Sequence, residues 1–237
     1  MSAPHVFASS VASDVVQITG DDAHHAVRVL RLRTGERITV SDGAGNVANA
    51  TITDAEPRLL RARVDQRRHV PRVPPWLVVV QGIPKAGKLD LVVQKLTEIG
   101  VDEIVPLKAA RSVARWDDGE KKVSRLSAIA REAAKQSHRA WLPDVGLPVT
   151  VEGLPAADLT IVLHEEEPGR LVDVLPPDPP ARFALVVGPE GGFAGDEIAM
   201  FVRNGAQLAG LGGQILRTET AALVAASLVL GRYGRIG

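Results

Sequence analysis

The sequence contains no cysteine among its 237 residues. This absence excludes disulfide bonds, zinc sites with thiolate ligands and catalysis by a thiol nucleophile. The sequence also lacks any apolar run of the roughly 18–20 residues that a helix needs to span a bilayer. Its first residues show no basic segment leading into an apolar one, as a secretory signal would. We therefore predict a cytoplasmic protein with no membrane partner.

Charge is balanced over the whole chain, with 28 Lys and Arg against 28 Asp and Glu. Basic residues outnumber acidic ones over residues 1–150, and the reverse holds over residues 151–237. Surpluses this small permit contact with a polyanion but do not by themselves indicate nucleic acid. The length lies between that of one large domain and two small ones.

The first part of the chain reads as short strands. Apolar and polar residues alternate, and the segment DGAG has the composition of a hairpin turn. One helical pattern interrupts the strands over residues 21–32. Short strands with a single helix favour a small barrel-like domain over residues 1–72. The expected strands cover residues 15–19, 37–42, 46–55 and 58–66.

A second domain is expected over residues 73–237. Three prolines within residues 69–76 indicate a linker before it. Strand-like and helix-like segments then alternate, which predicts an α/β domain with a largely parallel sheet. The expected strands cover residues 76–83, 102–107, 158–165, 183–190 and 206–212, and the expected helices cover residues 88–100, 119–138, 196–205 and 218–234.

Two common nucleotide-binding patterns are missing or incomplete. The segment GIPKAGKL matches G-x-x-x-x-G-K, but Leu89 stands where a P-loop needs the Mg²⁺-binding hydroxyl of Ser or Thr. The dinucleotide pattern G-x-G-x-x-G is absent. An NTP- or NAD-using enzyme is therefore disfavoured. Lys85 stays a candidate for phosphate contact, with a solvated loop lysine as the alternative.

The segment Gly188-Pro189-Glu190-Gly191-Gly192 points to a ligand. It follows an apolar strand, and glycines let backbone groups approach a ligand closely. Two other expected strands end at Leu163-His164 and at Leu211–Leu216. If the three strands are neighbours, their ends frame one pocket with apolar walls and backbone donors, which suits a flat heterocycle such as adenine. The alternative is a simple strand-to-helix turn.

The last helix begins beside this expected pocket. Thr218 or Thr220 is the expected cap, with Glu219 in the first turn. Arg217 directly precedes the helix, where a positive charge is electrostatically unfavourable, so a functional reason is plausible. No metal site is predicted, because adjacent side chains such as those of His24 and His25 diverge on a helix.

Five segments of the chain carry a resemblance to a known family: HHAVRVLRLRTGERITVSDGAGN, KLDLVVQKLTEIGVDEIVPL, REAAKQSHRAWLP, LVVGPEGGF and LGGQILRTETA. Together they resemble the RsmE family of small-subunit ribosomal RNA methyltransferases, in the SPOUT superfamily. The resemblance covers nearly the whole chain and implies an N-terminal PUA-like β-barrel and a C-terminal SPOUT α/β domain with a trefoil knot. It also implies a homodimer, S-adenosylmethionine as cofactor and methylation of a uridine at N3 in small-subunit ribosomal RNA. Free RNA and the assembled subunit are both open as the form of the substrate.

The resemblance also implies roles for individual residues. Arg217 and Glu190 would lie near the transferred methyl group, and Arg139 would face the target nucleotide, within the chain or across the dimer. Gln214 departs from the family pattern, where arginine is expected, so an anion contact from that position is in doubt. The cofactor would be surrounded by Leu163, His164, Gly188, Gly191, Gly192, Leu211, Gly212 and Leu216, and Arg28, Arg31 and Arg33 would contact RNA phosphates.

Methylation at uridine N3 sets two tasks for the protein, alignment of the reactants and removal of the N3 proton. Arg217 or Arg139 would stabilise negative charge on the uracil oxygens. Glu190 would act either as general base or as an acceptor for amides of its own loop. The chemistry requires no metal. The main alternative function is a non-catalytic RNA-binding protein that keeps a relic cofactor pocket.

Overall fold

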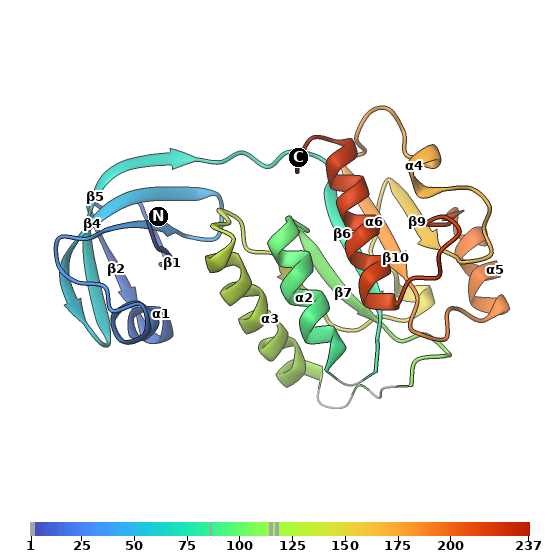
Figure 1. Ribbon diagram of the computed structural model, residues 1–237, viewed down its shortest axis with the longest axis horizontal. Helices are drawn as coiled ribbons and strands as arrows, with labels where there is room; N and C mark the ends of the chain where they lie inside the picture. Colours follow the sequence, from blue (N-terminus) through green and yellow to red (C-terminus); the bar gives the residue numbers. More distant parts are fainter. Residues whose placement is uncertain (1–2, 86, 114–115, 117–118) are drawn as a thin grey trace. The chain divides into compact units, whose positions relative to one another are not determined.

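The computed structural model of the chain describes residues 3–85, 87–113, 116 and 119–237. The chain forms two compact units (Figure 1). The first unit contains the residues up to Arg72 together with Ala134–Leu142, and the second contains Val73–Ala133 and Pro143–Gly237. The first unit thus includes a segment from beyond residue 72, and the division into functional domains stays a prediction.

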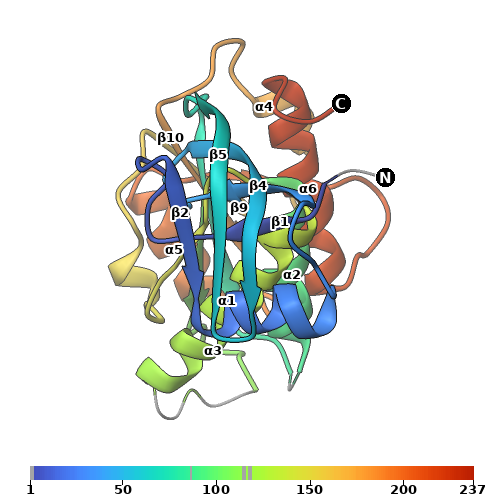
Figure 2. The same cartoon turned by 90° about the vertical axis from the view of Figure 1, so that its left-hand side faces the viewer.

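The first unit is built on a five-stranded sheet with the strand order β1-β3-β4-β5-β2 (Figure 2). The four strands expected from the alternation of apolar and polar residues are confirmed, as is the hairpin between β3 and β4. Two bulges between β4 and β5 let these long strands curl. The short β1, buried along its whole length, has no alternation to reveal it. The strands are β1 (His5–Phe7), β2 (Val15–Thr19), β3 (Arg37–Ser41), β4 (Asn46–Glu56) and β5 (Leu59–His69).

The helical segment expected over residues 21–32 is confirmed over residues 20–29 and ends earlier than expected. The structure has a short α-helix, α1 (Gly20–His24), which passes directly into a π-helical turn, η1 (His25–Val29). Arg31 then adopts a left-handed conformation with φ of 58°, which ends the helical segment. Buried side chains lie in both parts of the segment, with Ala23 in α1 and Ala26 in η1.

Residues 134–142 are held in the first unit by specific contacts. The carbonyl oxygen of Ala140 accepts a hydrogen bond from the Ser41 hydroxyl at 3.0 Å. Lys135 forms an ion pair with Asp22, and both side chains are buried. Removing one partner of a buried ion pair leaves the other charge buried and uncompensated, which is strongly destabilising. The pair therefore holds residues 134–142 firmly in the first unit.

The second unit contains a six-stranded sheet in the order β11-β9-β10-β6-β7-β8, and every pair in it is parallel. The expected α/β architecture is therefore confirmed. Its strands are β6 (Trp76–Gly82), β7 (Glu103–Leu107), β8 (Asp144–Val145), β9 (Leu159–Leu163), β10 (Arg182–Val187) and β11 (Gln207–Ala209). Its helices are α2 (Lys88–Ile99), α3 (Gly119–Gln136, whose last turn belongs to the first unit), the 3-10 turn η2 (Val151–Gly153), α4 (Leu171–Val174), α5 (Gly195–Arg203) and α6 (Thr218–Arg232).

The central strands are buried on both faces, as parallel strands covered by helices should be. Along β6, Leu77 and Val79 face the core formed with α2 and α6, whereas Val78 and Val80 face the core formed with α5. The chain runs from β6 outward to β7 on one side, while β10 and β9 lie on the other side of β6. Such a reversal of strand order leaves a crevice at the carboxyl ends of the strands, where ligands bind in this class of sheet.

The first unit contains a buried titratable group in β1. His5 is 5% exposed, and neither of its ring nitrogens has a hydrogen-bond partner within the described residues. Its ring centroid lies 5.4 Å from that of His138. Burial and, next, the neighbouring His138 lower the pKa of His5 from its ordinary 6.5 to about 4. His5 is therefore neutral in the folded protein under ordinary conditions.

We expect the first unit to lose stability as the pH falls below 6.5, because the unfolded chain then binds a proton that folded His5 does not. The contribution of His5 is fully present above pH 6.5 and is lost as the pH falls to about 4. A His5→Phe variant cannot titrate. Between pH 6.5 and about pH 5, the difference in free energy of unfolding between variant and wild type should change by about 1.5 kcal/mol.

Urea unfolding at the two pH values measures this difference. A His24→Phe variant is the control, because His24 is exposed and its replacement should leave the pH dependence of the wild type in place. Equal pH dependence in the wild type and in His5→Phe would contradict the prediction.

Candidate functional site

A pocket of about 630 Å³ lies at the carboxyl ends of β9, β10 and β11. These three strands are neighbours in the sheet, in the order β11-β9-β10, as the pocket expected from the sequence required. The chain segments that follow them meet around the pocket, and all residues that line it belong to the second unit. The lining comes mainly from residues 163–166, 187–193 and 209–217.

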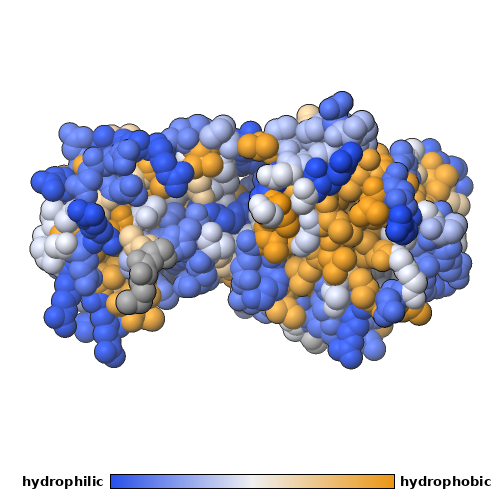
Figure 3. All heavy atoms as spheres, turned by 45° about the horizontal axis from the view of Figure 1, so that its top comes forward, coloured by the Kyte–Doolittle hydropathy of each residue, from blue (hydrophilic) through white to orange (hydrophobic). Residues whose placement is uncertain are grey.

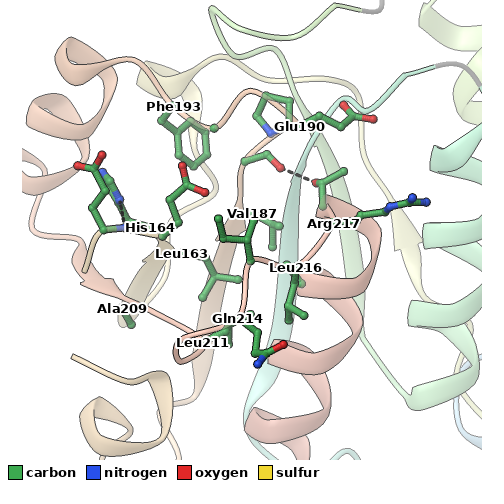
Figure 4. A pocket seen from close by; sticks show the side chains of 18 of the residues that line it. Leu163, His164, Val187, Glu190, Phe193, Ala209, Leu211, Gln214, Leu216 and Arg217 are labelled. Carbon is green, nitrogen blue, oxygen red and sulfur yellow. Dashed lines mark hydrogen bonds between the residues drawn. The ribbon is translucent and has the colours of Figure 1, made fainter. Parts of the chain in front are cut away.

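The pocket has apolar walls. Figure 4 shows the side chains of Leu163, Val187 and Leu216 around its centre, with Phe193 on the side of the glycine-rich loop. Polar groups stand mostly at the edges. This combination of an apolar interior with few polar groups is typical of sites for small organic ligands.

Close approach of backbone segments explains the glycines around the loop of residues 188–192. A Cβ atom on Gly82, at the end of β6, would lie only 2.4 Å from the backbone nitrogen of Pro189. Gly192 has a φ of 64°, which favours glycine, and its N–H donates to the carbonyl oxygen of Pro189 at 2.9 Å. The loop therefore lies directly on the end of β6, with no side chain between them.

Thr218 connects this loop to the sheet and to α6. Its hydroxyl donates to the carbonyl oxygen of Gly188 at 2.5 Å and accepts a hydrogen bond from Nε2 of Gln81 at 2.8 Å. The expectation that Thr218 or Thr220 caps α6 is therefore wrong. Arg217 occupies the cap position without a capping side chain, and the Thr218 hydroxyl is already used by the loop.

The carboxylate of Glu190 is held by its own surroundings. It accepts hydrogen bonds from the backbone N–H of Lys85 at 3.1 and 3.3 Å, and Nζ of Lys88 lies 3.3 Å from it. Burial would raise the pKa of Glu190, but these contacts, together with its own backbone N–H, hold that pKa below the ordinary value. A carboxylate with a lowered pKa is a weak proton acceptor, which favours the structural alternative for Glu190.

Arg217 is a basic residue of the pocket lining. It is exposed, and its side chain has no ion-pair or hydrogen-bond partner within the described residues. Figure 4 shows its side chain extending away from Leu163 and Leu211. Gln214 lines the same pocket and is exposed, and the neighbouring Ile215 is 85% exposed. The loop that carries them therefore presents both polar and apolar groups to solvent.

The structure places most of the predicted cofactor residues around this pocket. Gly191 is not among the lining residues, because it faces the side chain of Arg111 instead. Sequence reasoning missed Arg111, which follows β7 and is distant in sequence from the three strand ends. The predicted cofactor residues that line the pocket are Leu163, His164, Gly188, Gly192, Leu211, Gly212 and Leu216.

The residues predicted to contact RNA are divided between the two units. Lys85 is exposed in the second unit, and Arg139 belongs to residues 134–142 of the first. Within the described chain, the exposed side chains of Arg28, Arg31 and Arg33 have no carboxylate partner, so they are available to an anionic ligand. By contrast, three arginines of β5 are each paired with an aspartate, in the pairs Arg61–Asp54, Arg63–Asp65 and Arg67–Asp14.

Over the residues that the structure describes, no group of three or more His, Asp or Glu side chains could hold a metal ion. No helix in the described ranges is long and apolar enough to cross a bilayer.

Comparison with protein families gives two matches. Residues 71–230 match the RNA methyltransferase domain, and residues 18–65 match the RNA methyltransferase PUA domain. The first match covers more than half of the chain and includes the whole pocket.

Individual relatives agree with these families. The chain is 40% identical to the ribosomal RNA small subunit methyltransferase E of Mycobacterium tuberculosis, over 91% of this chain and 86% of the relative. The corresponding enzyme of Bacillus subtilis is 32% identical, over 90% and 88%.

Solved structures are similar over nearly the whole chain. Ribosomal RNA small subunit methyltransferase E from Neisseria gonorrhoeae, bound to S-adenosyl methionine, has a TM-score of 0.87 at 27% identity, with 98% of each chain covered. A chain from Legionella pneumophila, solved with bound S-adenosyl methionine, has a TM-score of 0.89 at 28% identity, with the same coverage. The present chain therefore belongs to the ribosomal RNA small subunit methyltransferase E family.

Proposed function

We propose that this protein transfers a methyl group from S-adenosylmethionine to N3 of a uridine in small-subunit ribosomal RNA. The observation that carries the proposal is the pocket at the ends of β9, β10 and β11, in a chain of this methyltransferase family. Because ribosomal RNA is the substrate, the proposed place of action is the cytoplasm. The substrate is either the free RNA or the assembled small subunit.

The residues of the pocket fit this cofactor. A volume of about 630 Å³ suits a ligand of that size. The apolar walls suit the adenine ring, and the glycines of the loop leave backbone groups close to the ligand. S-adenosylmethionine carries two positive charges, on its sulfonium and its ammonium group, and three carboxylates line the pocket. They belong to Glu165, Glu166 and Glu190.

The chemistry divides between cofactor and protein. When bound, the cofactor supplies a methyl group already activated by the positive sulfur. The protein aligns the uracil ring so that N3, once its proton has left, points at the methyl carbon. We assign to Arg217 the stabilisation of negative charge that develops on the uracil carbonyl oxygens, since its guanidinium is exposed beside the pocket and has no partner in the described chain.

Glu190 is better suited to a structural role than to that of general base. Its oxygens already accept hydrogen bonds from the Lys85 amide, and they face the Lys88 ammonium group. Its lowered pKa weakens it as a proton acceptor. The N3 proton then leaves to solvent, or to a group that RNA binding brings close.

For the RNA, we assign phosphate contacts to the exposed arginines of the first unit, Arg28, Arg31 and Arg33, and to Lys85 of the second. Their lack of carboxylate partners in the described chain supports this assignment. Arg139 is assigned to the target nucleotide. In this proposal, residues 1–72 act as a PUA-like RNA-binding barrel and residues 73–237 as the SPOUT methyltransferase domain.

We also infer a trefoil knot in the second unit. After β11, at one edge of the sheet, residues 210–217 carry the chain back to α6, which packs on β10 and β6. On the way the chain meets the loop after β10, where Thr218 binds Gly188. A chain trace from a crystal structure would overturn the inference if residues 210–217 did not thread through the preceding chain.

A homodimer is proposed because α6 is apolar on all sides. Over residues 221–230 only Ser227 is polar, and Val224 and Leu228 are 37% and 38% exposed. A helix that is apolar all round belongs in a buried position. The neighbouring α2 adds Leu91, 44% exposed, and Figure 3 shows a broad apolar area on the second unit. A second copy of the chain would cover this surface.

Methyl transfer from labelled S-adenosylmethionine to unmodified small ribosomal subunits tests the proposed function. We expect label in 3-methyluridine after digestion of the RNA to nucleosides. Label in a different nucleoside would overturn the assignment to N3. Cofactor binding without transfer to either free RNA or subunits would favour the non-catalytic alternative.

A Glu190→Gln variant tests the role of Glu190. Loss of a general base typically lowers the rate by about 10²–10⁴-fold. Because we assign Glu190 a structural role, we expect this variant to lower kcat by less than about 10-fold. The acid limb of the pH–rate profile should be unchanged. Glutamine keeps an oxygen that accepts the Lys85 amide. Glu190→Ala removes that acceptor and should weaken cofactor binding instead. A loss in kcat at the level of a missing base would show that Glu190 takes the proton.

Substitution of Leu228 tests the dimer. We expect Leu228→Glu to give the mass of one chain in light scattering and the wild type to give twice that mass, because a charge in an apolar interface is strongly unfavourable. Val202→Glu is the matched control, since Val202 is 50% exposed on α5. The same mass for the wild type and both variants would count against this interface.

A further inference from the structure

Arg111 has no role in the site described so far. It follows β7 in a turn closed by the N–H of Ser112 on the carbonyl oxygen of Ala109 at 2.9 Å. Its side chain is exposed and lines the pocket, and it makes no ion pair within the described ranges. Arg111 and Arg217 are the two arginines of the pocket lining.

One N–H of the Arg111 guanidinium is fixed by the glycine-rich loop. Nη1 donates to the carbonyl oxygen of Gly191 at 3.0 Å. A guanidinium has five N–H donors in a planar fork, so most of its donors stay available to a ligand. The contact orients the guanidinium group and leaves its other N–H donors able to bind a ligand.

The backbone beside Arg111 is fixed to the segment that follows this loop by a buried carboxylate. Glu197, on α5, is 8% exposed. Its Oε1 accepts the N–H of Ala110 at 2.8 Å, and its Oε2 accepts the N–H of Ala194, also at 2.8 Å. One side chain therefore joins the turn after β7 to Ala194, two residues beyond the loop of residues 188–192.

Gly191 gives the Arg111 side chain its space. A Cβ atom on Gly191 would lie 3.2 Å from Cβ of Arg111 and 3.6 Å from its Cδ. A side chain at position 191 would therefore require Arg111 to shift by a few tenths of an ångström. Gly191 and Glu197 thus act as positioning residues for Arg111.

Position and charge decide which ligand Arg111 meets. The walls assigned to the cofactor follow β9, β10 and β11, whereas Arg111 follows β7, which lies on the other side of β6. The pocket carboxylates suit the positive cofactor. A guanidinium fork suits a phosphate group, which it can bind through two N–H donors.

We propose that Arg111 binds a backbone phosphate of the RNA beside the target nucleotide, and that Gly191 and Glu197 hold it in position. The inference rests on the proposed function, because it takes RNA as the substrate.

The salt dependence of RNA binding tests the proposal. With a small-subunit ribosomal RNA fragment and S-adenosylhomocysteine, Arg111→Gln should weaken binding by about tenfold. The slope of log affinity against log salt concentration should fall by about 0.7–0.9, the value for one lost phosphate contact. Arg111→Lys should restore the slope, because it restores the charge. Calorimetry should give an unchanged Kd for S-adenosylmethionine.

Two further variants sharpen the result. Arg203→Gln removes an exposed arginine from α5 and should leave affinity and slope unchanged. Gly191→Ala should weaken RNA binding in the wild-type background but cause no further loss in the Arg111→Gln background, because it acts through Arg111.

If Arg111→Gln also raised the Kd for S-adenosylmethionine, Arg111 would be assigned to the cofactor instead. If Arg111→Gln left the salt slope of RNA binding unchanged, Arg111 would be only a structural contact of the loop. Either result overturns the proposal. Failure of the proposed function looks different, since methyl transfer would then be missing from the wild type itself.

Discussion

The pocket depends on the hydrogen bonds made by the Thr218 hydroxyl. This group joins the first turn of α6 to the Gly188 carbonyl of the glycine-rich loop and to Gln81 at the end of β6. Thr218 and Gln81 are buried, so each unmade bond would leave a polar group without water, at a cost of about 1–3 kcal/mol. The loop also lies directly on Gly82. These contacts fix the positions of the strand ends, the loop and the last helix, and the pocket is the space that they enclose.

Charge around the pocket is arranged by pairing. Glu190 is balanced by Lys88 and by the Lys85 amide, so the loop carries a carboxylate that stays ionised. Within the described chain, neither Arg217 nor Arg111 has a carboxylate partner, and Nη1 of Arg111 donates to the carbonyl oxygen of Gly191. The paired groups stabilise the structure of the site, whereas the unpaired arginine side chains are available to bind an anionic ligand. The same distinction separates the arginines after α1 from the three paired arginines of β5.

The sequence allowed the α/β domain and the pocket to be predicted, because both follow from local patterns. Apolar runs predict buried parallel strands, and glycines at the strand ends predict close backbone approach. Features that depend on contacts distant in sequence were missed. Nothing local shows that residues 134–142 join the first unit through Lys135 and Asp22, or that Arg111 reaches the loop. The prediction that Thr218 caps α6 was wrong for the same reason, because its hydroxyl donates instead to the carbonyl oxygen of Gly188, which is distant in sequence.

The glycine-rich loop contacts both the pocket assigned to the cofactor and the arginine assigned to the RNA. Gly188 and Gly192 line the pocket assigned to the cofactor, while the Gly191 carbonyl holds Arg111, assigned here to the RNA. The buried carboxylate of Glu197 also joins the turn after β7 to Ala194, just beyond the loop, so the turn and the loop are connected through two sets of hydrogen bonds. A ligand that shifts the loop therefore changes the position of Arg111. Linkage requires the effect to be mutual, so any change that the cofactor makes to RNA affinity equals the change that RNA makes to cofactor affinity.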